Sequence, residues 1–278
     1  MMNYSIIVPY YDKYDLFKKA VDSIPDRDDI QVVIVDNAPH SLDKKLIPRK
    51  ENAKVIYITS SPDKGAVCAR NEGLRHVAAR YILFLDADDY FASEAFTAFD
   101  RYLEKDYDIV FFQPTSVYLS DNSLSDRHID YEHMIKEYLT SHDERRLRYR
   151  WDSPWAKLYR ADFVLGGNFY FEEKPVGNDA WFSLQTGHNA KKITVDYSVV
   201  YVVTEGKTGQ SLTKKISKEN VLIRYEGAIR INKFLKKIGQ YDMHIRLLGF
   251  LRTAYSNFGF LELIHFLKIA FQEKANIF

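Results

Sequence analysis

Apolar, β-branched runs alternate with helical patterns in the first third of the chain, and this alternation constrains the fold more than any other feature. The predicted strands cover residues 5–11, 31–37, 54–59 and 81–88. Helices are predicted between them over 15–24 and 65–80. Strands joined through helices at this spacing favour a parallel or mixed sheet with helices on both faces and right-handed connections. The first third therefore predicts an α/β fold.

The rest of the sequence is less regular. Helices are predicted over 93–103, over 131–139 and from Asp179, and strands over 108–113 and 198–205. The segment TEGKTGQSLT (204–213) has the composition of a loop that closes over a ligand, with Gly206 and Gly209 as hinges, or of an ordinary surface loop. We predict a main domain over 1–213, with halves of 1–113 and 114–213, and a helical C-terminal extension over 214–278.

The composition excludes several classes of protein. Apolar residues make up 46% of the chain and charged residues 28%, and no stretch approaches the ~20 apolar residues that span a bilayer. The start, MMNYSIIVPYYD, lacks the basic and apolar regions of a secretion signal. A single cysteine, Cys68, allows no internal disulfide and suits a reducing compartment. We therefore expect a cytoplasmic protein without a transmembrane helix.

The charge is unevenly distributed along the chain. Residues 214–278 contain 12 Lys/Arg against five Asp/Glu, a net of +7, which leaves a net of −6 for residues 1–213. An acidic main domain without zinc-ligand spacing argues against nucleic-acid binding. Basic residues interleave with Phe and Leu over 230–271, which is compatible with peripheral contact to the inner face of an anionic plasma membrane. Packing of these helices on the sheet, or a homo-oligomer interface, is the alternative.

Carboxylates follow three of the predicted strands at the same end. Asp12 follows the first strand, Asp36 ends the second, and LFLDADD ends the fourth with Asp86, Asp88 and Asp89. Ligands of open α/β sheets bind beyond the carboxyl ends of the strands, so these side chains converge on one site if the strands are neighbours. Taken singly, each is also typical of a strand end or a helix cap.

The segment Asp86-Ala87-Asp88 is the most informative of these. Alternate side chains of an extended segment point the same way, so we expect Asp86 and Asp88 to present two carboxylates to one side. Such a pair suits a ribose hydroxyl and a divalent cation, Mg²⁺ or Mn²⁺, that bridges the phosphates of a nucleotide diphosphate. The segment therefore predicts metal-assisted nucleotide binding.

Six segments of the chain together resemble a known family. They are SIIVPYYDKYDLFKKAVDSI, VVIVDNAPH, GAVCARNEGL, ILFLDADDY, WAKLYRADFV and NDAWF. Their order is similar to that in family 2 glycosyltransferases of the GT-A fold, and the resemblance covers residues 4–205. It implies an inverting, metal-dependent transfer from a nucleotide-sugar donor, most often a UDP-sugar. The acceptor implied is a glycan or a lipid-linked precursor, as in the synthesis of bacterial surface polysaccharides.

The resemblance also implies roles for individual residues. The implied nucleotide-sugar contacts are Pro9, Tyr11, Asp12, Asp36, Arg70, Asp86 and Ala87. Among them, Asp36 would contact the base, Arg70 would face the nucleotide or its phosphates, and Asp86 would hydrogen-bond the ribose. Asp88 would bind the divalent metal.

The general base implied by the resemblance is Asp179. Single displacement at an anomeric carbon needs a group that takes the proton of the acceptor hydroxyl. In the family this group is the acid of a Glu-Asp pair at a helix start, whereas here the segment reads GNDAWF, with Asn178 in place of the glutamate. A helix cap is the structural alternative for Asp179. A second departure is Asn37, which replaces the second acid after the second strand and bears on base recognition.

Trp155 and Lys157 stand where the family borders its acceptor site. Aromatic rings stack on the apolar faces of sugars, so Trp155 and the nearby Trp151 are candidates for acceptor contact. Burial in the core is the alternative for both.

Two other functions are compatible with parts of this pattern. A nucleotidyltransferase would also use paired aspartates, but it predicts a Gly-rich, basic phosphate loop near the N-terminus, and VPYYDKYD offers none. A degenerate, non-catalytic scaffold subunit would explain Asn37 and Asn178. Retention of Asp86, Asp88 and Asp179 favours the enzyme.

Overall fold

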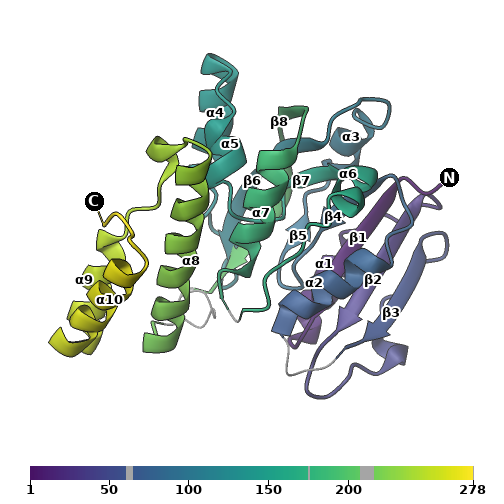
Figure 1. Cartoon of the computed structure of the whole chain (residues 1–278). Helices are drawn as coiled ribbons and strands as arrows, with labels where there is room; N and C mark the ends of the chain where they lie inside the picture. Colours follow the sequence, from purple (N-terminus) through teal and green to yellow (C-terminus); the bar gives the residue numbers. More distant parts are fainter. Residues whose placement is uncertain (61–64, 175, 207–215, 278) are drawn as a thin grey trace.

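The structure is a computed structural model that describes residues 1–60, 65–174, 176–206 and 216–277. In these residues eight strands form one mixed sheet in the order β3-β2-β1-β4-β7-β6-β8-β5 (Figure 1). The strands are β1 (Tyr4–Tyr10), β2 (Ile30–Asp36), β3 (Lys54–Thr59), β4 (Tyr81–Phe84), β5 (Tyr90–Phe91), β6 (Ile109–Tyr118), β7 (Lys157–Arg160) and β8 (Ile193–Glu205). The predicted α/β class is confirmed.

The first four strands of this order run parallel. Helix α1 (Tyr14–Asp22) connects β1 to β2, and α2 (Gly65–Arg75) connects β3 to β4. Every residue of β1 and β2 is buried, which explains why both strands read as continuous apolar runs in the sequence. Because β2, β1 and β4 are parallel neighbours, their carboxyl ends lie together at one edge of the sheet.

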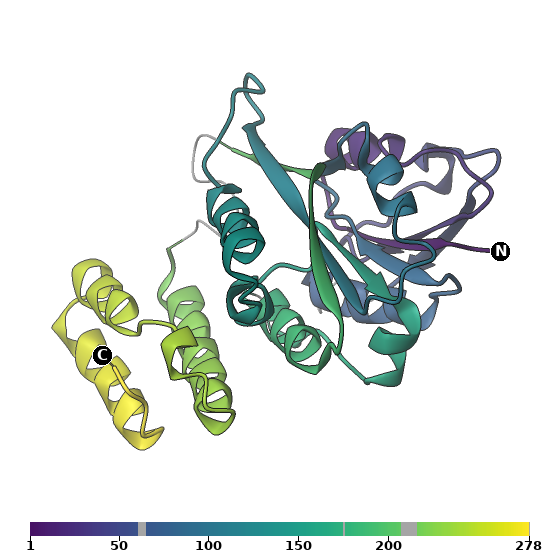
Figure 2. The same cartoon turned by 90° about the horizontal axis from the view of Figure 1, so that it is seen from above.

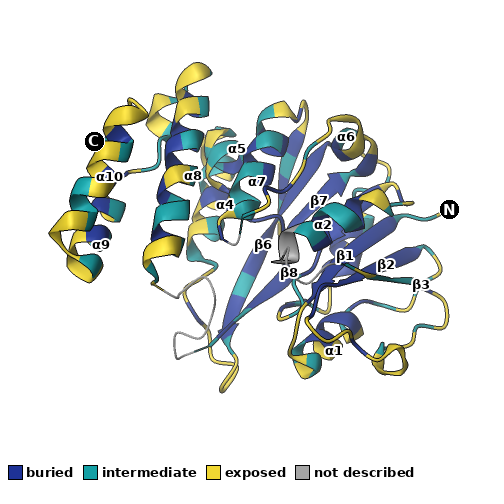
Figure 3. Ribbon diagram, turned by 60° about the horizontal axis from the view of Figure 1, so that its bottom comes forward, coloured by how far each residue is buried: buried dark blue, intermediate teal, exposed yellow. Residues whose placement is uncertain are grey.

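The remaining helices cover the rest of the sheet and extend beyond it. They are α3 (Ala95–Asp100), α4 (Ile129–Ser141), α5 (Arg145–Arg150), α6 (Ala161–Gly166), α7 (Asn178–Asn189), α8 (Lys218–Lys237), α9 (Leu248–Phe258) and α10 (Phe260–Gln272), with short 3₁₀ turns at Lys44–Leu46 and Tyr241–Met243. Figure 2 shows helices on both faces of the sheet, and Figure 3 shows the central strands as largely buried, with the edge strand β3 more exposed.

Three predicted elements end at least three residues earlier than expected. The helix predicted over 65–80 ends at Arg75, and the helix predicted over 93–103 is limited to α3. The strand predicted over 81–88 ends at Phe84, and the amide of Asp89 donates a hydrogen bond to the carbonyl of Asp86 at 3.0 Å, closing a turn. Aspartate favours turns over strands. The expectation that the strand extends through Asp86 and Asp88 was therefore wrong, while the presentation of both carboxylates to one side stays a prediction.

The region that lacked a clear pattern contributes one strand to the centre of the sheet. Strand β7 lies between β4 and β6 and is antiparallel to both. It has four residues, too few to show an alternating pattern in the sequence. Through β7, the part of the chain after residue 114 pairs directly with the N-terminal strand β4.

The C-terminal helices contact the sheet-bearing part of the chain through α8. The guanidinium of Arg230 lies 3.9 Å from the ring centroid of Trp181 on α7 and forms an ion pair with the buried Glu172. Helices α9 and α10 form a hairpin against α8 around a separate apolar cluster that includes Tyr225 and Phe266 (Figure 1). Within the described residues, no helix combines the length and apolar character needed to cross a membrane.

Helices α5 and α7 approach closely at Gly187, and we predict that Gly187→Ala destabilises the fold. A Cβ at this position would overlap the carbonyl oxygen of Arg148, whose guanidinium also donates to the carbonyl of Gly187 at 2.7 Å. The backbone must shift, so we expect the free energy of unfolding to fall by about 1–3 kcal/mol in urea denaturation. Gly227→Ala on α8 is the matched control, because nothing lies within 4 Å of the added Cβ. Equal losses in both variants would contradict the packing argument.

Candidate active site

The carboxylates predicted at the strand ends do share one edge of the sheet. Asp36 ends β2, Asp12 follows β1 by two residues, and Asp86 follows β4 by two residues. The side chain of Asp12 is exposed, as is that of Tyr11, with 45% of its surface accessible. Pro9, by contrast, is buried within β1 opposite Val35.

Asp36 is fully buried, and both of its carboxylate oxygens are engaged. They accept hydrogen bonds from the amides of Ala38 at 2.9 Å and Leu42 at 2.7 Å, and from the hydroxyl of Tyr57. In this state Asp36 holds the loop after β2, and its contact with a base stays a prediction. The adjacent Asn37 is also fully buried, and its side-chain amide has no hydrogen-bond partner among the described residues.

The turn after β4 gives its three aspartates different surroundings. Asp89 is 4% exposed and accepts hydrogen bonds from the Tyr201 hydroxyl at 2.9 Å and the Thr204 amide at 2.7 Å. Burial, and the charges of Asp88 and Asp86, raise the pKa of Asp89. The Tyr201 hydroxyl in turn accepts from the amide of Asp86 at 3.1 Å. Asp89 and Tyr201 therefore fasten the turn to β8, a role that the sequence pattern did not indicate.

Asp88 occupies the exposed position of this turn. Its carbonyl accepts a hydrogen bond from the Thr204 hydroxyl, while its carboxylate accepts none from another described side chain. Desolvation by the surrounding protein and the charge of Asp86 raise the pKa of Asp88, although its side chain reaches solvent. Ala87, between the two, is partly buried.

Arg70 connects Asp86, in the turn after β4, to the candidate base Asp179. Its guanidinium donates to Asp86 Oδ1 at 2.5 Å and to Asp179 Oδ1 at 2.8 Å, and the residue is only 5% exposed. Burial by itself lowers the pKa of Arg70, but Asp179 and Asp86 outweigh this effect and raise it. Arg70 is therefore a charged residue whose two partners belong to different parts of the site.

Asp179 lies in the first turn of α7 and faces Arg70. Desolvation raises its pKa to about 6; Arg70 and Lys157 act against this shift, and Asp86 and Asp152 add to it. The side-chain amide of Asn178 donates instead to the carbonyl of Lys174 at 3.1 Å. The pKa of Asp179 is therefore raised, although the residue before it is Asn178 and not the glutamate that is usual in the family.

A second contact, between α2 and the segment that precedes α7, supports this arrangement. Asn71 donates to the carbonyl of Phe171 at 2.9 Å and accepts from its amide at 2.9 Å. The ring of Phe171 stacks on Phe182 of α7 and lies 5.5 Å from the guanidinium of Arg70. Asn71 belongs to one of the segments that resemble the family, but its role depends on a partner 100 residues away and was missed.

The residues expected on the acceptor side are buried. Trp155 is 4% exposed and stacks on Tyr201 with a centroid distance of 5.2 Å. Lys157 is 2% exposed, its ammonium lies 3.3 Å from the carbonyl of Trp151, and burial lowers its pKa well below the usual value. Acceptor contact by Trp155 and Lys157 stays a prediction. The exposed group in this region is Asp152, which accepts from the hydroxyl of Tyr131 at 2.7 Å and was not singled out in the sequence.

The turn after β4 carries carboxylate oxygens of the kind that bind Mg²⁺ or Mn²⁺ together with the phosphates of a nucleotide. The described residues contain no cluster of three or more protein ligands that would hold a metal by themselves. Such ions are commonly bound through one or two carboxylates together with substrate phosphates, so a single open carboxylate suffices. Asp88 fits this description, because its carboxylate is exposed and close to a second negative charge.

A parallel sheet edge that gathers several aspartates is typical of α/β proteins that bind a ligand beyond the carboxyl ends of their strands. The chain matches the profile of "Glycosyl transferase family 2" over residues 5–164, which is more than half of its length. The chain therefore belongs to glycosyl transferase family 2. This confirms the resemblance in the sequence.

Two relatives illustrate the similarity in sequence. The chain is 25% identical over 213 residues to "Uncharacterized glycosyltransferase EpsJ" of Bacillus subtilis, covering 72% of this chain and 60% of that protein. It is 29% identical over 117 residues to the "UDP-Glc:alpha-D-GlcNAc-diphosphoundecaprenol beta-1,3-glucosyltransferase WfaP" of Escherichia coli, covering 41% of this chain and 46% of that protein. The chain thus spans less than two thirds of either relative.

Two solved structures share the fold. The structure of Staphylococcus aureus TarS 1–349 in complex with UDP-GlcNAc superposes with a TM-score of 0.64 at 21% identity, covering 98% of this chain and 73% of that one. The mannosyltransferase PcManGT of Pyrobaculum calidifontis, in complex with GDP-Man and Mn²⁺, superposes with a TM-score of 0.58 at 13% identity, covering 99% and 81%. Both matches extend over nearly the whole chain and confirm the predicted GT-A fold.

Proposed function

We propose that this chain is an inverting glycosyltransferase that moves a sugar from a UDP-sugar to a hydroxyl of a bacterial surface glycan or of its lipid-linked precursor. The observation that carries the proposal is the double ion pair of Arg70, which joins Asp86 at the donor side to Asp179 at the start of α7. Donor binding and proton removal can therefore take place within the reach of one side chain.

In the proposed reaction Asp179 takes the proton of the acceptor hydroxyl. The oxygen forms a bond to the anomeric carbon as the bond from that carbon to the diphosphate breaks, and the nucleoside diphosphate leaves. A carboxylate whose pKa is raised to about 6 is still mostly ionised at neutral pH and is a stronger base than an ordinary aspartate. Asp86 would hold the ribose. A divalent cation on Asp88 would neutralise charge on the leaving diphosphate.

The choice of donor and acceptor rests on the relatives. WfaP is named for transfer of glucose from a UDP-sugar to a diphosphoundecaprenol-linked acceptor, and TarS is seen with UDP-GlcNAc. We propose the same classes of donor and acceptor here, which would place the protein at the cytoplasmic face of the plasma membrane. The nucleotidyltransferase alternative has no support in the structure or the relatives.

Calorimetric titration with UDP, in the presence and absence of Mn²⁺, tests the proposal. We expect binding that requires the metal, and an affinity at least about tenfold lower, or ~1.4 kcal/mol, in Asp88→Ala. GDP and dTDP serve as nucleotide controls. The matched protein control is Asp162→Ala, because Asp162 lies at the start of α6, after β7 and therefore at the opposite edge of the sheet from Asp88. Absence of binding by any nucleotide would reject the enzyme and favour the scaffold subunit.

A further inference from the structure

Helix α10 carries apolar side chains on the face that it turns away from the protein. Phe260, Ile264, Leu267 and Phe271 are spaced by four, three and four residues, which places them on one side of the helix. Phe260 is 64% exposed, Leu267 39% and Phe271 86%. Next to them, Leu261 is 79% exposed at the start of the helix. We call these five residues the α10 apolar face.

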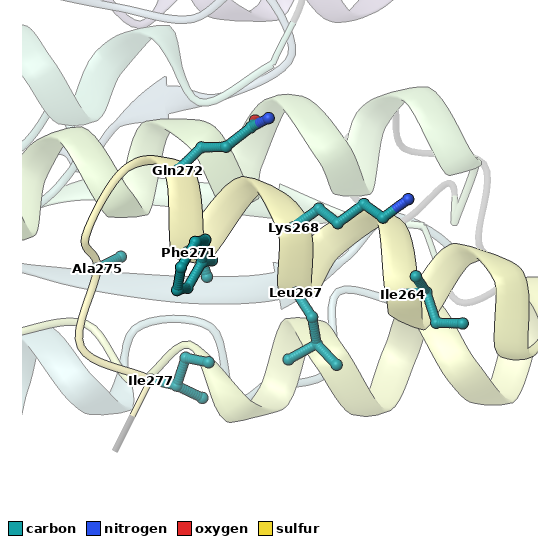
Figure 4. Close-up of a pocket in the computed structure, with 8 residues that line it drawn as sticks. Ile264, Leu267, Lys268, Phe271, Gln272, Ala275 and Ile277 are labelled. Carbon is teal, nitrogen blue, oxygen red and sulfur yellow. The ribbon is translucent and has the colours of Figure 1, made fainter.

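The α10 apolar face is not the face that holds the helix in place. The residues that α10 buries against α8 and α9, Phe266 and Ala270, lie on a different side of the helix. A hollow of about 680 Å³ runs beside the exposed face, lined by Ile264, Leu267, Phe271 and the tail residues up to Ile277 (Figure 4). Surface helices normally present polar residues to water, so an apolar face of this extent indicates a further contact.

The charges of the segment from Arg246 to Ile277 that lack an ion-pair partner among the described residues are all positive. The hairpin and its tail contain two carboxylates, and α8 neutralises both: Glu262 pairs with Lys218 at 2.5 Å, and Glu273 pairs with Lys233. The cations of the same segment are Arg246, Arg252, Lys268 and Lys274. None of them forms an ion pair with another described residue. The surface that remains is apolar and cationic.

We propose that the α10 apolar face and its flanking cations bind the surface of an anionic lipid bilayer. Apolar side chains enter the boundary between headgroups and acyl chains, while lysine and arginine stay at the headgroups. This inference rests on the proposed function, because a lipid-linked acceptor is reached at such a surface. In Figure 1 the turn between α9 and α10 lies on the same side of the molecule as the carboxyl ends of β1 and β2.

A second copy of the chain is a less suitable partner for this surface. A two-fold symmetric contact brings the same patch of both copies together, so Lys268, which lines the hollow beside this face, would approach its own counterpart without a carboxylate from the hairpin between them. Like charges across an interface disfavour association. A bilayer that contains anionic lipids supplies the missing negative charge.

Co-sedimentation with lipid vesicles tests the proposal. We expect the wild-type chain to bind vesicles of phosphatidylglycerol mixed with phosphatidylcholine, and to bind pure phosphatidylcholine much more weakly. Phe271→Glu should lower the partition coefficient by about tenfold or more, and Lys268→Glu by about fivefold or more. Leu139→Glu is the matched control, because Leu139 on α4 is also exposed, by 49%, but lies outside the hairpin.

The outcomes separate this inference from the proposed function. Failure of the wild type to bind anionic vesicles, or an equal loss in Leu139→Glu, overturns the lipid contact. A dimer seen by light scattering and dispersed by Phe271→Glu, without vesicle binding, assigns the surface to a second copy instead. UDP titration of the same variants should be unchanged. If UDP binding fails in the wild type while vesicle binding persists, the transferase proposal fails and the lipid contact stands.

Discussion

Replacing Asp179 with asparagine should abolish sugar transfer while leaving UDP binding unchanged. Asparagine keeps an oxygen that can accept from Arg70, now 2.8 Å from Asp179 Oδ1, but it cannot take the proton of the acceptor. Loss of a general base costs roughly 10²- to 10⁴-fold in rate. The measurement is kcat for transfer to an acceptor, with UDP calorimetry on the same preparation.

The matched control for this variant is Asp162→Asn, which changes a first-turn aspartate of another helix, α6, at the opposite edge of the sheet. Its kcat should equal that of the wild type. Transfer by Asp179→Asn within a few-fold of the wild type would contradict the assignment of the base. In that case Asp152, the exposed carboxylate whose charge acts on Asp179, becomes the candidate.

Replacing Arg70 with alanine should lower kcat/KM and move its pH dependence. Removing one preorganised, positively charged donor from an active site typically costs about 10²- to 10³-fold in rate, so we expect kcat/KM to fall by about 100-fold or more. The base acts when ionised, and the rate falls as the pH drops through its pKa. Arg70 lowers the pKa of Asp179, so its removal raises that pKa further above the value of about 6. The acid limb of kcat/KM should therefore shift to higher pH.

Arg70→Lys provides the comparison, because lysine keeps the positive charge but loses the paired donors that reach Asp86 and Asp179 at once. Its acid limb should lie between those of the wild type and Arg70→Ala. The other charges that act on Asp179, those of Asp86, Asp152 and Lys157, are unchanged in both variants. A reduced rate with an unshifted acid limb would show that Arg70 only supports the fold.

The parallel half of the fold could be predicted because its strands are buried on both faces. Continuous apolar runs such as those of β1 and β2 are visible without knowledge of their partners, and each begins and ends within one residue of the prediction. The four-residue strand β7 is defined by its neighbours β4 and β6, so no local pattern could reveal it. The turn at Asp86 was not predicted, because the alternation of side chains along a strand does not show where the strand ends.

The residues of the candidate site were predicted, but the hydrogen bonds and ion pairs between them were not. Asp86 and Asp88 were placed by the strand end and Asp179 by the family resemblance. The ion pairs of Arg70 connect residues up to 109 positions apart and depend on how α7 packs against α2. The same holds for Asp36, whose buried hydrogen bonds to the loop after β2 cannot be read from a strand-end aspartate.

The two side-chain links from α2, Arg70 to Asp179 and Asn71 to Phe171, also limit how this protein can be recombined with its relatives. A chimera that replaces the segment after residue 114, in order to change the acceptor, would remove one partner of each link. The graft must therefore bring its own aspartate at 179 and a backbone at 171 that matches Asn71. We therefore expect a change of acceptor to succeed more readily when surface loops are grafted onto a retained α7 than when the whole segment after residue 114 is exchanged.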